Sequence, residues 1–502
     1  MNLFDRAING VCDAIIAREK LLNSYIHKKT SFPQAKQRKI FLGMGKNITK
    51  VGDERPIDIP ESILNRHAYL IGATGSGKSI LLRYLVYQLI RAGYGVLFID
   101  MKGEYEIWED MWKACYFSGR QNDFTYFSPI VGSDKFPRTT VKWNPLILGD
   151  ANVVTSKIMD AIGNDDPASQ FYEKVKYDVL FCIISCMKEI DAVPTLKDIA
   201  FVFESPTNMD MLIKMTPEGE SKRNLHSKLI EWNTNPRLWV QNYTGTKVAI
   251  KELCTGLQGT LCNAVKPTLS VTDMIEKGGV TYCYLPTMIA KDAMRSIGKM
   301  MLSEIKTVAG NIQAFKSDKV KFAIIVDEFE ELVFKAVKDL FNKARSAGIS
   351  MIIGHQTLSD IDYEVKSKSF ALSIMDNTAS KLIMQIKSKA SAELFAENIG
   401  EYKPIPFLSR WITTKYVVHP DDLMGKSSLN DEGLEVGELI AKIDAELYRV
   451  KVPYPPKAHN IKIGKDIPWP TREYPEYDYG EALNLVPAET RPIRKTAKTE
   501  EE

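Results

Sequence analysis

The stretch that decides the fold is residues 72–79, Gly-Ala-Thr-Gly-Ser-Gly-Lys-Ser. It matches G-x-x-x-x-G-K-[ST], the pattern of a glycine-rich loop that wraps a phosphate group. An apolar run, residues 68–72, comes directly before it, and residues 78–92 follow with leucines at helical spacing. In this strand–loop–helix order, glycines let the backbone fold around phosphates, and the helix N-terminus adds partial positive charge.

Every position of this loop is therefore a candidate phosphate contact. We expect Lys78 to reach the β- and γ-phosphates of a nucleotide and Ser79 to hold Mg²⁺. The rest of the loop would bind phosphate oxygens mainly through its backbone, at Gly72, Ala73, Thr74, Gly75, Ser76 and Gly77.

A second candidate site follows the apolar run 322–326, which reads as a buried strand ending in Asp327 and Glu328. We expect Asp327 to complete the Mg²⁺ environment and Glu328 to be the base that polarises the attacking water. The alternative is a buried strand with a solvated acidic end, because Glu330 and Glu331 follow. The phosphate-binding loop in the same chain favours the catalytic interpretation.

The combination indicates which nucleotide is used. Two acids beside one Mg²⁺ site, without specificity motifs of kinases or GTPases, point to hydrolysis of ATP. GTPases of the common type carry an N-K-x-D motif that recognises the base, and this sequence has none.

Four further residues are weaker candidates. Asp100 ends the apolar run 95–100 and would lie beside the nucleotide at the carboxyl edge of a parallel sheet, unless it only forms a polar turn. Gln356 follows another apolar run and is a better candidate for a γ-phosphate sensor than His355, which we take as a loop residue. Arg345 is either an arginine finger for a neighbouring subunit or part of a surface salt bridge, and Arg295 is a weaker finger candidate.

Composition excludes several classes of protein. With 502 residues, 44% of them hydrophobic and 26% charged, the chain can bury several cores, and it is not a disordered, collagenous or disulfide-stapled chain. A net charge of +3 does not by itself indicate nucleic-acid or membrane binding. The seven scattered cysteines, without a CxxC pair, indicate reduced thiols in a cytoplasmic protein. No apolar run approaches the ~18–20 residues of a membrane span.

The pattern of strands and helices divides the chain into five parts. Strand–helix alternation over 39–150 and 271–452 predicts an α/β nucleotide-binding domain in two pieces. Helical periodicity dominates 151–270 and predicts an inserted all-α domain. Residues 1–38 read as an amphipathic helix with a basic stretch. Residues 453–502 are proline-rich, and we expect them to be extended or disordered and to bury little apolar surface.

These motifs together resemble the HerA/FtsK superfamily of P-loop ATPases. Within it they are most similar to the coupling proteins of conjugation and type IV secretion, the TraG, TraD and TrwB families. The matching segments are Phe41–Gly45 (FLGMG), Asp100–Glu104 (DMKGE, with Met101 in place of the usual proline), Trp143–Leu146 (WNPL), Arg345–Met351 leading to His355–Gln356, and Asp376–Lys381 (DNTASK). The resemblance implies a RecA-like P-loop ATPase domain with an inserted all-α domain.

The resemblance also implies a function and partners. It predicts a homo-hexamer with a central channel, in which ATP hydrolysis moves DNA, or a DNA-linked relaxase, toward a type IV secretion channel and its inner-membrane components. Lys222 and Arg223, in the helical segment 221–228, are candidate DNA contacts, although a solvated helix face explains them equally well. Two rival functions remain open: a HerA-like motor for DNA repair or phage defence, and a receptor platform for secreted proteins.

The N-terminus differs from that of the coupling proteins. Those proteins usually have membrane-spanning helices before the FLG-like strand, whereas residues 1–38 here are polar and amphipathic. We therefore expect a cytoplasmic protein, peripheral at the inner membrane if it meets the membrane at all. Either it acts without its own span, or the membrane part is a separate subunit.

Overall fold

The structure is a computed structural model that describes residues 39–50, 52–132, 135–163, 169–316, 318–357, 361, 370–402, 415–426, 433–453, 461–470 and 472–485. The helix predicted within 1–38 and the end of the tail, 486–502, lie outside these residues. The chain divides into two compact units. Unit 1 holds the chain up to Val141 together with Ser270–Glu473, and unit 2 holds Lys142–Leu269 together with the chain from Tyr474 onward.

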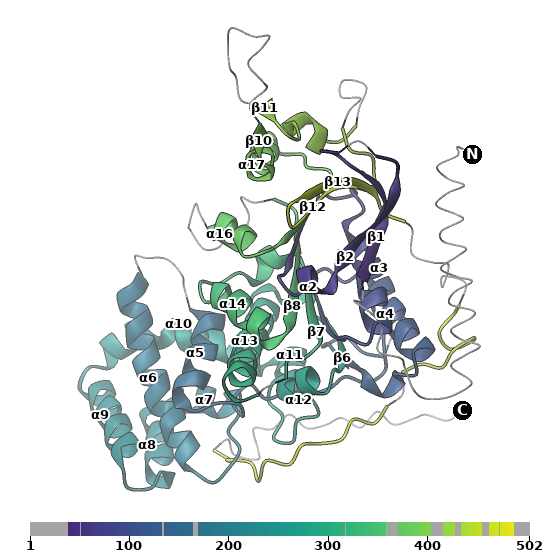
Figure 1. Cartoon of the computed structure of the whole chain (residues 1–502). Helices are drawn as coiled ribbons and strands as arrows, with labels where there is room; N and C mark the ends of the chain where they lie inside the picture. The colour runs from purple at the N-terminus through teal and green to yellow at the C-terminus, as the bar shows by residue number, and fades with distance from the viewer. Residues whose placement is uncertain are drawn as a thin grey trace. The chain divides into compact units, whose positions relative to one another are not determined.

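Unit 1 is built on one 11-stranded sheet with the order β2-β1-β13-β12-β9-β3-β8-β7-β4-β6-β5 (Figure 1). Its strands are β1 (Lys39–Asn47), β2 (Arg55–Pro60), β3 (Ala68–Ile71), β4 (Gly95–Asp100), β5 (Phe124–Phe127), β6 (Val280–Tyr284), β7 (Phe322–Asp327), β8 (Ile349–His355), β9 (Ser380–Ile383), β12 (Glu438–Ile443) and β13 (Glu446–Lys451). A separate pair is formed by β10 (Glu401–Tyr402) and β11 (Lys415–Tyr416).

The strands from β9 to β5 run parallel to their neighbours, and β12, β13, β1 and β2 extend the sheet in antiparallel fashion. β4, β7 and β8 are buried along their whole length, which explains their continuous apolar sequences. The register places Asp100 beside Asp327 and Ile71 beside His355. The parallel strands therefore bring Asp100, Asp327 and the start of the loop 72–79 to one edge of the sheet.

Helices cover both faces of the parallel strands (Figure 1). α3 (Lys78–Arg91) and α4 (Tyr105–Phe117) pack on one face, where their apolar residues share a core with Phe98 and Ile325. α13 (Thr287–Phe315) and α14 (Val337–Ala347) pack against each other on the other side. Among its described residues, unit 1 has four further α-helices: α2 (Glu61–Leu64), α12 (Val271–Glu276), α16 (Phe370–Asp376) and α17 (Lys389–Ile399).

The described core of unit 2 is helical. Its helices are α5 (Ala151–Ile162), α6 (Gln170–Glu189), α7 (Leu196–Val202), α8 (Pro206–Met215), α9 (Glu220–Thr234), α10 (Pro236–Cys254) and α11 (Gly256–Leu261). Capping residues define where several of these helices begin. Ser205, just before α8, accepts a hydrogen bond from the Asn208 amide, and Pro206 is the first residue of the helix. α9 and α10 are joined through stacked indole rings of Trp232 and Trp239, whose centroids are 4.5 Å apart.

The tail corrects one prediction. Ile467, Leu483 and Leu485 are buried, and the Trp469 ring stacks on Trp108 with centroids 5.7 Å apart. The expectation that the tail buries little apolar surface is therefore wrong for residues 461–470 and 472–485. Composition missed this because a few large apolar side chains, spaced along an extended proline-rich chain, are enough to anchor it to a folded surface.

Two further expectations concern membranes and thiols. No helix among the described residues is both long enough and apolar enough to cross a bilayer. Among the cysteines that the structure describes, Cys254 is partly buried, and these are buried thiols: Cys115, Cys182, Cys186, Cys262 and Cys283.

Candidate nucleotide-binding site

The loop 72–79 is held from both sides by backbone hydrogen bonds. The Ala73 amide donates to the Gln385 carbonyl at 2.8 Å, and the Ser76 carbonyl accepts the Gly437 amide at 2.9 Å. Gly75 and Gly77 have φ values of +83° and +102°, in a region that residues with a Cβ rarely adopt. α3 then begins at Lys78, so the amides of its first turn have no carbonyl partners within the helix and face the loop. This is the backbone geometry of an anion site.

Lys78 and Asp327 form a buried ion pair. The Lys78 Nζ lies 2.9 Å from Oδ1 of Asp327, and the two side chains are 9% and 2% exposed. The Nζ makes this contact without hydrogen-bond geometry. The same Asp327 oxygen accepts the Glu328 amide at 3.0 Å. The structure thus joins the two motifs that the sequence placed about 250 residues apart.

Glu328 is held in an unusual backbone conformation. Its φ of +56° lies in the left-handed region, which is uncommon for residues other than glycine and is found at strained functional sites. Burial, and the neighbouring Asp327 charge to a lesser extent, raise the pKa of the Glu328 carboxyl above its ordinary value. The side chain is therefore placed in the desolvated surroundings typical of a catalytic base.

Gln356 lies between the loop and Glu328. Its Oε1 accepts a hydrogen bond from the Thr74 hydroxyl at 3.0 Å, and its Nε2 lies 3.4 Å from Oε1 of Glu328. His355 faces a different environment, because its buried ring packs against Tyr69 and its Nδ1 bonds the Thr357 carbonyl. Burial lowers the pKa of His355 to about 3, so the ring is neutral near pH 7.

Asp100 lies where the sequence predicts, at the carboxyl end of β4 beside Asp327. Its carboxylate is 1% exposed and accepts hydrogen bonds from the Tyr282 hydroxyl and from the amides of Lys102, Gly103 and Glu104, at 2.6–3.0 Å. Burial raises the pKa of Asp100, although these donors oppose the shift. Both oxygens of Asp100 thus hold the loop 100–104 in place, and a contact of Asp100 with nucleotide stays a prediction.

The loop 100–104 places Glu104 against Ser79 of the phosphate-binding loop, residues 72–79, which we call the P-loop. The sequence pattern did not predict this contact. The Ser79 hydroxyl donates to Oε1 of Glu104 at 3.0 Å, and the Lys102 ammonium donates to the same oxygen at 2.8 Å. The hydrogen bond to Glu104 raises the pKa of Lys102. The DMKGE segment was the only sequence signal for this residue.

Glu330 is a second carboxyl that was overlooked. Its Oε2 is buried without a hydrogen-bond partner, and burial raises the pKa of the carboxyl to about 7. The sequence showed it only as one member of an acidic run after β7.

The arginine candidates do not lie with these groups. Arg345 is exposed on α14, and Arg295 of α13 forms an ion pair with Glu331. In unit 2, Lys222 is paired with Glu218, and Arg223 is exposed on α9. The role of Arg345 as an arginine finger stays a prediction.

The donor groups at this site fit Mg²⁺ together with phosphates. The Ser79 hydroxyl and the Asp327 carboxylate offer oxygen ligands, and Mg²⁺ usually takes only one or two protein carboxylates beside phosphates and water. Within the described ranges, no cluster of three or more His, Cys, Asp or Glu residues is arranged to hold a metal alone. The Lys78 Nζ, buried without a hydrogen bond, fits a phosphate at the same place.

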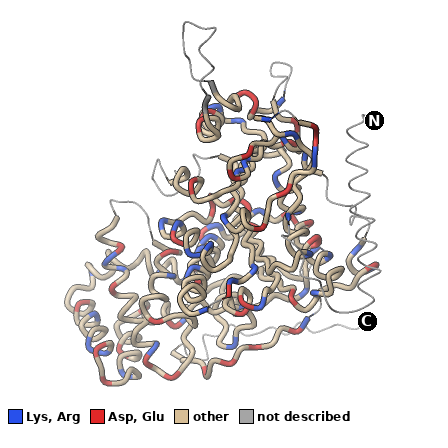
Figure 2. Tube along the Cα trace, viewed as in Figure 1, with Lys and Arg blue, Asp and Glu red and all other residues tan. Residues whose placement is uncertain are grey.

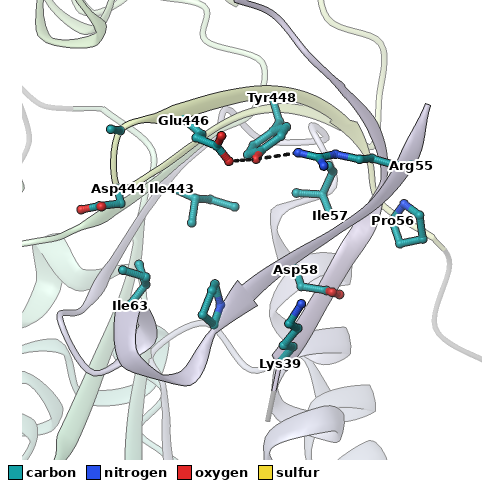
Figure 3. A pocket seen from close by; sticks show the side chains of 12 residues that line it. Lys39, Arg55, Pro56, Ile57, Asp58, Ile63, Ile443, Asp444, Glu446 and Tyr448 are labelled. Carbon is teal, nitrogen blue, oxygen red and sulfur yellow. Dashed lines mark hydrogen bonds between the residues drawn. The ribbon is translucent and has the colours of Figure 1, made fainter. Parts of the chain in front are cut away.

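A separate pocket of ≈ 400 Å³ lies at the β2 edge of the sheet, between β1, β2 and the β12–β13 turn (Figure 3). Arg55 donates to the Tyr448 hydroxyl at 3.1 Å, and Tyr448 bonds Glu446. Asp444 pairs with Arg66, and Glu446 pairs with Lys50. Most of the charged groups in this pocket thus pair with protein groups, so it does not compete with the P-loop as the nucleotide site.

Two family models match the chain. A model described as the central domain of the helicase HerA matches residues 44–252, which include the P-loop. A model described as the TraM recognition site of TraD and TraG matches residues 321–406, which include Asp327, Glu328, Arg345 and Gln356. The models cover residues 44–252 and 321–406, and with the relatives below they support a type IV secretion coupling protein of the HerA/FtsK superfamily. The resemblance that the motifs indicated is thereby confirmed.

One curated relative of this chain is the type 4 coupling protein DotL of Legionella pneumophila subsp. pneumophila strain Philadelphia 1. The two are 24% identical over 128 residues, which cover 24% of this chain and 16% of DotL. The match therefore spans only a small part of that protein.

Solved structures of the conjugative coupling protein TrwB share the fold. An unbound form lacking its N-terminal segment has a TM-score of 0.57 and 16% identity, covering 85% of this chain and 96% of TrwB. TrwB in complex with ADP and Mg²⁺ has a TM-score of 0.56 and 16% identity, and the match covers 85% of this chain and 96% of TrwB. These matches confirm the predicted fold class, an α/β P-loop ATPase fold of RecA type.

Proposed function

We propose that this coupling protein hydrolyses Mg-ATP and uses the energy to deliver DNA, or a relaxase–DNA substrate, to a type IV secretion channel. The observation that carries the proposal is the Lys78–Asp327 contact, with Glu328 beside it and Gln356 between Glu328 and the loop. Two relatives support a role in secretion or conjugation, since DotL is named a type 4 coupling protein and TrwB a conjugative coupling protein.

The chain's own residues account for the chemistry. The loop amides and Lys78 bind the phosphates and place the γ-phosphate near the ends of β7 and β8. Ser79 and Asp327 would hold Mg²⁺, which when bound neutralises charge on the phosphate oxygens. Glu328 takes a proton from the attacking water, and Gln356 orients Glu328 and reads whether a γ-phosphate is present.

Energy coupling needs more than one copy of the chain. Arg345 is exposed on α14 and lies apart from its own P-loop cluster, so we assign it to the ATP site of a neighbouring subunit in a homo-hexamer. Lys and Arg are mixed with Asp and Glu along both units (Figure 2). DNA contact therefore depends on a few basic side chains gathered locally, with Lys222 and Arg223 as candidates.

The proposed partners follow from this role. They are DNA, a relaxase or another secreted protein, and inner-membrane components of the secretion machine, with the protein acting on the cytoplasmic side. A second function, that of a receptor for secreted proteins, is favoured by exposed apolar side chains in unit 2. They include Phe171, Met211, Met215, Ile230, Leu238, Val240, Val248 and Leu257, each at least 40% exposed.

The experiment that separates the two functions compares ATP hydrolysis by the purified chain alone, with single-stranded DNA and with double-stranded DNA. DNA stimulation of the rate supports the motor. Tight binding of a secreted protein, without any DNA effect on the rate, supports the receptor and contradicts the motor.

A further inference from the structure

We propose that Glu104 is a positioning residue for Ser79: its carboxylate fixes the hydroxyl proton so that the oxygen lone pairs face Mg²⁺. The inference rests on the proposed function, because it concerns the same Mg-ATP site. Its basis is the hydrogen bond of 3.0 Å from the Ser79 hydroxyl to Oε1 of Glu104.

The chemistry of a hydroxyl makes this contact consequential. A serine hydroxyl has one proton and two lone pairs, and its proton rotates toward the best acceptor within reach. To bind a cation, the oxygen must direct its proton away from the metal. An ionised carboxylate is a strong acceptor, so Glu104 fixes the orientation that metal binding needs.

Asp327, the other candidate Mg²⁺ ligand, does not take this role in the structure. Its Oδ1 contacts the Lys78 Nζ at 2.9 Å and accepts the Glu328 amide at 3.0 Å. The hydroxyl of Ser79 donates instead to Glu104, on the neighbouring loop. The two carboxylates thus contact different residues: Asp327 contacts Lys78, and Glu104 orients Ser79.

The loop 100–104 is built to hold Glu104 in place. Asp100 accepts the Glu104 amide at 3.0 Å and also fixes the two amides before it. Gly103 has a φ of +97°, and a Cβ there would lie 2.3 Å from the Tyr284 hydroxyl. Lys102 binds the same Glu104 oxygen as Ser79 and balances its charge. Three of the other four residues of DMKGE therefore serve to place the Glu104 carboxylate.

Partners that orient a metal ligand usually change metal affinity by roughly 10–100-fold when they are removed. We therefore expect Glu104→Ala to weaken the Mg²⁺-dependent part of nucleotide binding by roughly this factor. Glu104→Gln keeps an oxygen that accepts the Ser79 proton and should lose less. Nucleotide binding without a metal should stay unchanged in both, because Lys78 and the loop amides are intact.

The test is calorimetric titration of ADP into full-length protein, in Mg²⁺ and in EDTA, with wild type, Glu104→Ala, Glu104→Gln and the control Glu106→Gln. Glu106 is an acid two residues away, in the first turn of α4. The thermal unfolding midpoint without nucleotide shows whether each variant is folded. We expect the effect of Mg²⁺ on ADP affinity to shrink in the order wild type, Gln variant, Ala variant, and to be unchanged in the Glu106 control.

Two results would overturn the inference. One is an unchanged Mg²⁺ effect in both Glu104 variants, while wild type binds Mg-ADP more tightly than ADP; the proposed function would survive this. The other is an equal loss of affinity in Mg²⁺ and in EDTA, which indicates a structural role for Glu104. A wild-type chain that binds no nucleotide would instead contradict the proposed function, and this inference with it.

Discussion

The Nζ of Lys78 lies 2.9 Å from Oδ1 of Asp327, and neither side chain is more than 9% exposed. Lys78 starts the helix after the P-loop, and Asp327 ends the central strand β7. One ion pair therefore ties the loop 72–79 to the strand that precedes Glu328, the proposed catalytic base. Because both charges are buried, removing either one leaves the other without compensation.

Lys78→Ala should accordingly affect stability as well as binding. Loss of one partner of a buried ion pair costs about 3–5 kcal/mol, so we expect a lower denaturation midpoint together with loss of nucleotide binding. Denaturant unfolding without nucleotide measures the first effect and ADP titration the second. A variant that binds no ADP but unfolds at the wild-type midpoint would show that the contact contributes nothing to stability.

Glu330 should make stability fall as the pH rises. Its folded pKa, about 7, lies above the ordinary value of 4.5, so the folded state holds its proton more tightly than the unfolded state. The contribution of Glu330 to the free energy of unfolding is fully present below about pH 4.5 and is lost as the pH rises toward 7. Glu330→Gln removes this loss.

The unfolding midpoint of Glu330→Gln, relative to wild type, should therefore be higher at pH 8 than at pH 5. Subtracting the wild-type midpoint from that of the variant at each pH removes the contributions of the other titrating groups, which both proteins share. Equal differences at the two pH values would mean that Glu330 titrates normally in the folded chain.

The raised pKa of Glu328 predicts the pH dependence of hydrolysis. The base must be ionised to accept a proton from water, and burial holds its carboxyl protonated to a higher pH than an exposed glutamate. The rate at saturating ATP should rise with pH through an apparent pKa above the ordinary value of 4.5. A rate that is flat from pH 5 upward would contradict an unusually high pKa for the base.

Gly103→Ala should disturb the loop that holds Glu104. An alanine there meets both the positive φ and a contact of 2.3 Å with the Tyr284 hydroxyl. Gly119 is a matched control, with a φ of +69° and no atom within 4 Å of its Cβ position. Both alanine variants should lose about 1 kcal/mol to backbone strain. The Gly103 variant should lose more and should also bind Mg-ADP more weakly. Equal effects in the two variants would show that the packing on Tyr284 is unimportant.

The basic side chains of α9 give a prediction about DNA. Replacing Lys222 and Arg223 by alanine should reduce DNA stimulation of hydrolysis and leave the rate without DNA unchanged. Lys251→Ala is a suitable control, because that lysine is exposed on α10 and paired with Glu204. Undiminished stimulation in the double variant would place the DNA contact elsewhere.

The sequence predicted the parts of the molecule that local pattern determines. The P-loop and the strand ending at Asp327 could be found because continuous apolar runs and a fixed glycine spacing leave few other structures. The role of Asp100 could not be found in this way, since its partner Tyr282 lies 182 residues away. The contact of Glu104 with Ser79, and the burial of Leu483 in the tail, likewise depend on how distant segments come together.

The most direct test of the central claim compares ATP turnover and ATP binding in wild type and Glu328→Gln. If Glu328 is the base of a P-loop ATPase, the variant should bind Mg-ATP as wild type does and hydrolyse it roughly 10²–10⁴-fold more slowly. Turnover at the wild-type rate in the Glu328→Gln protein would contradict the account.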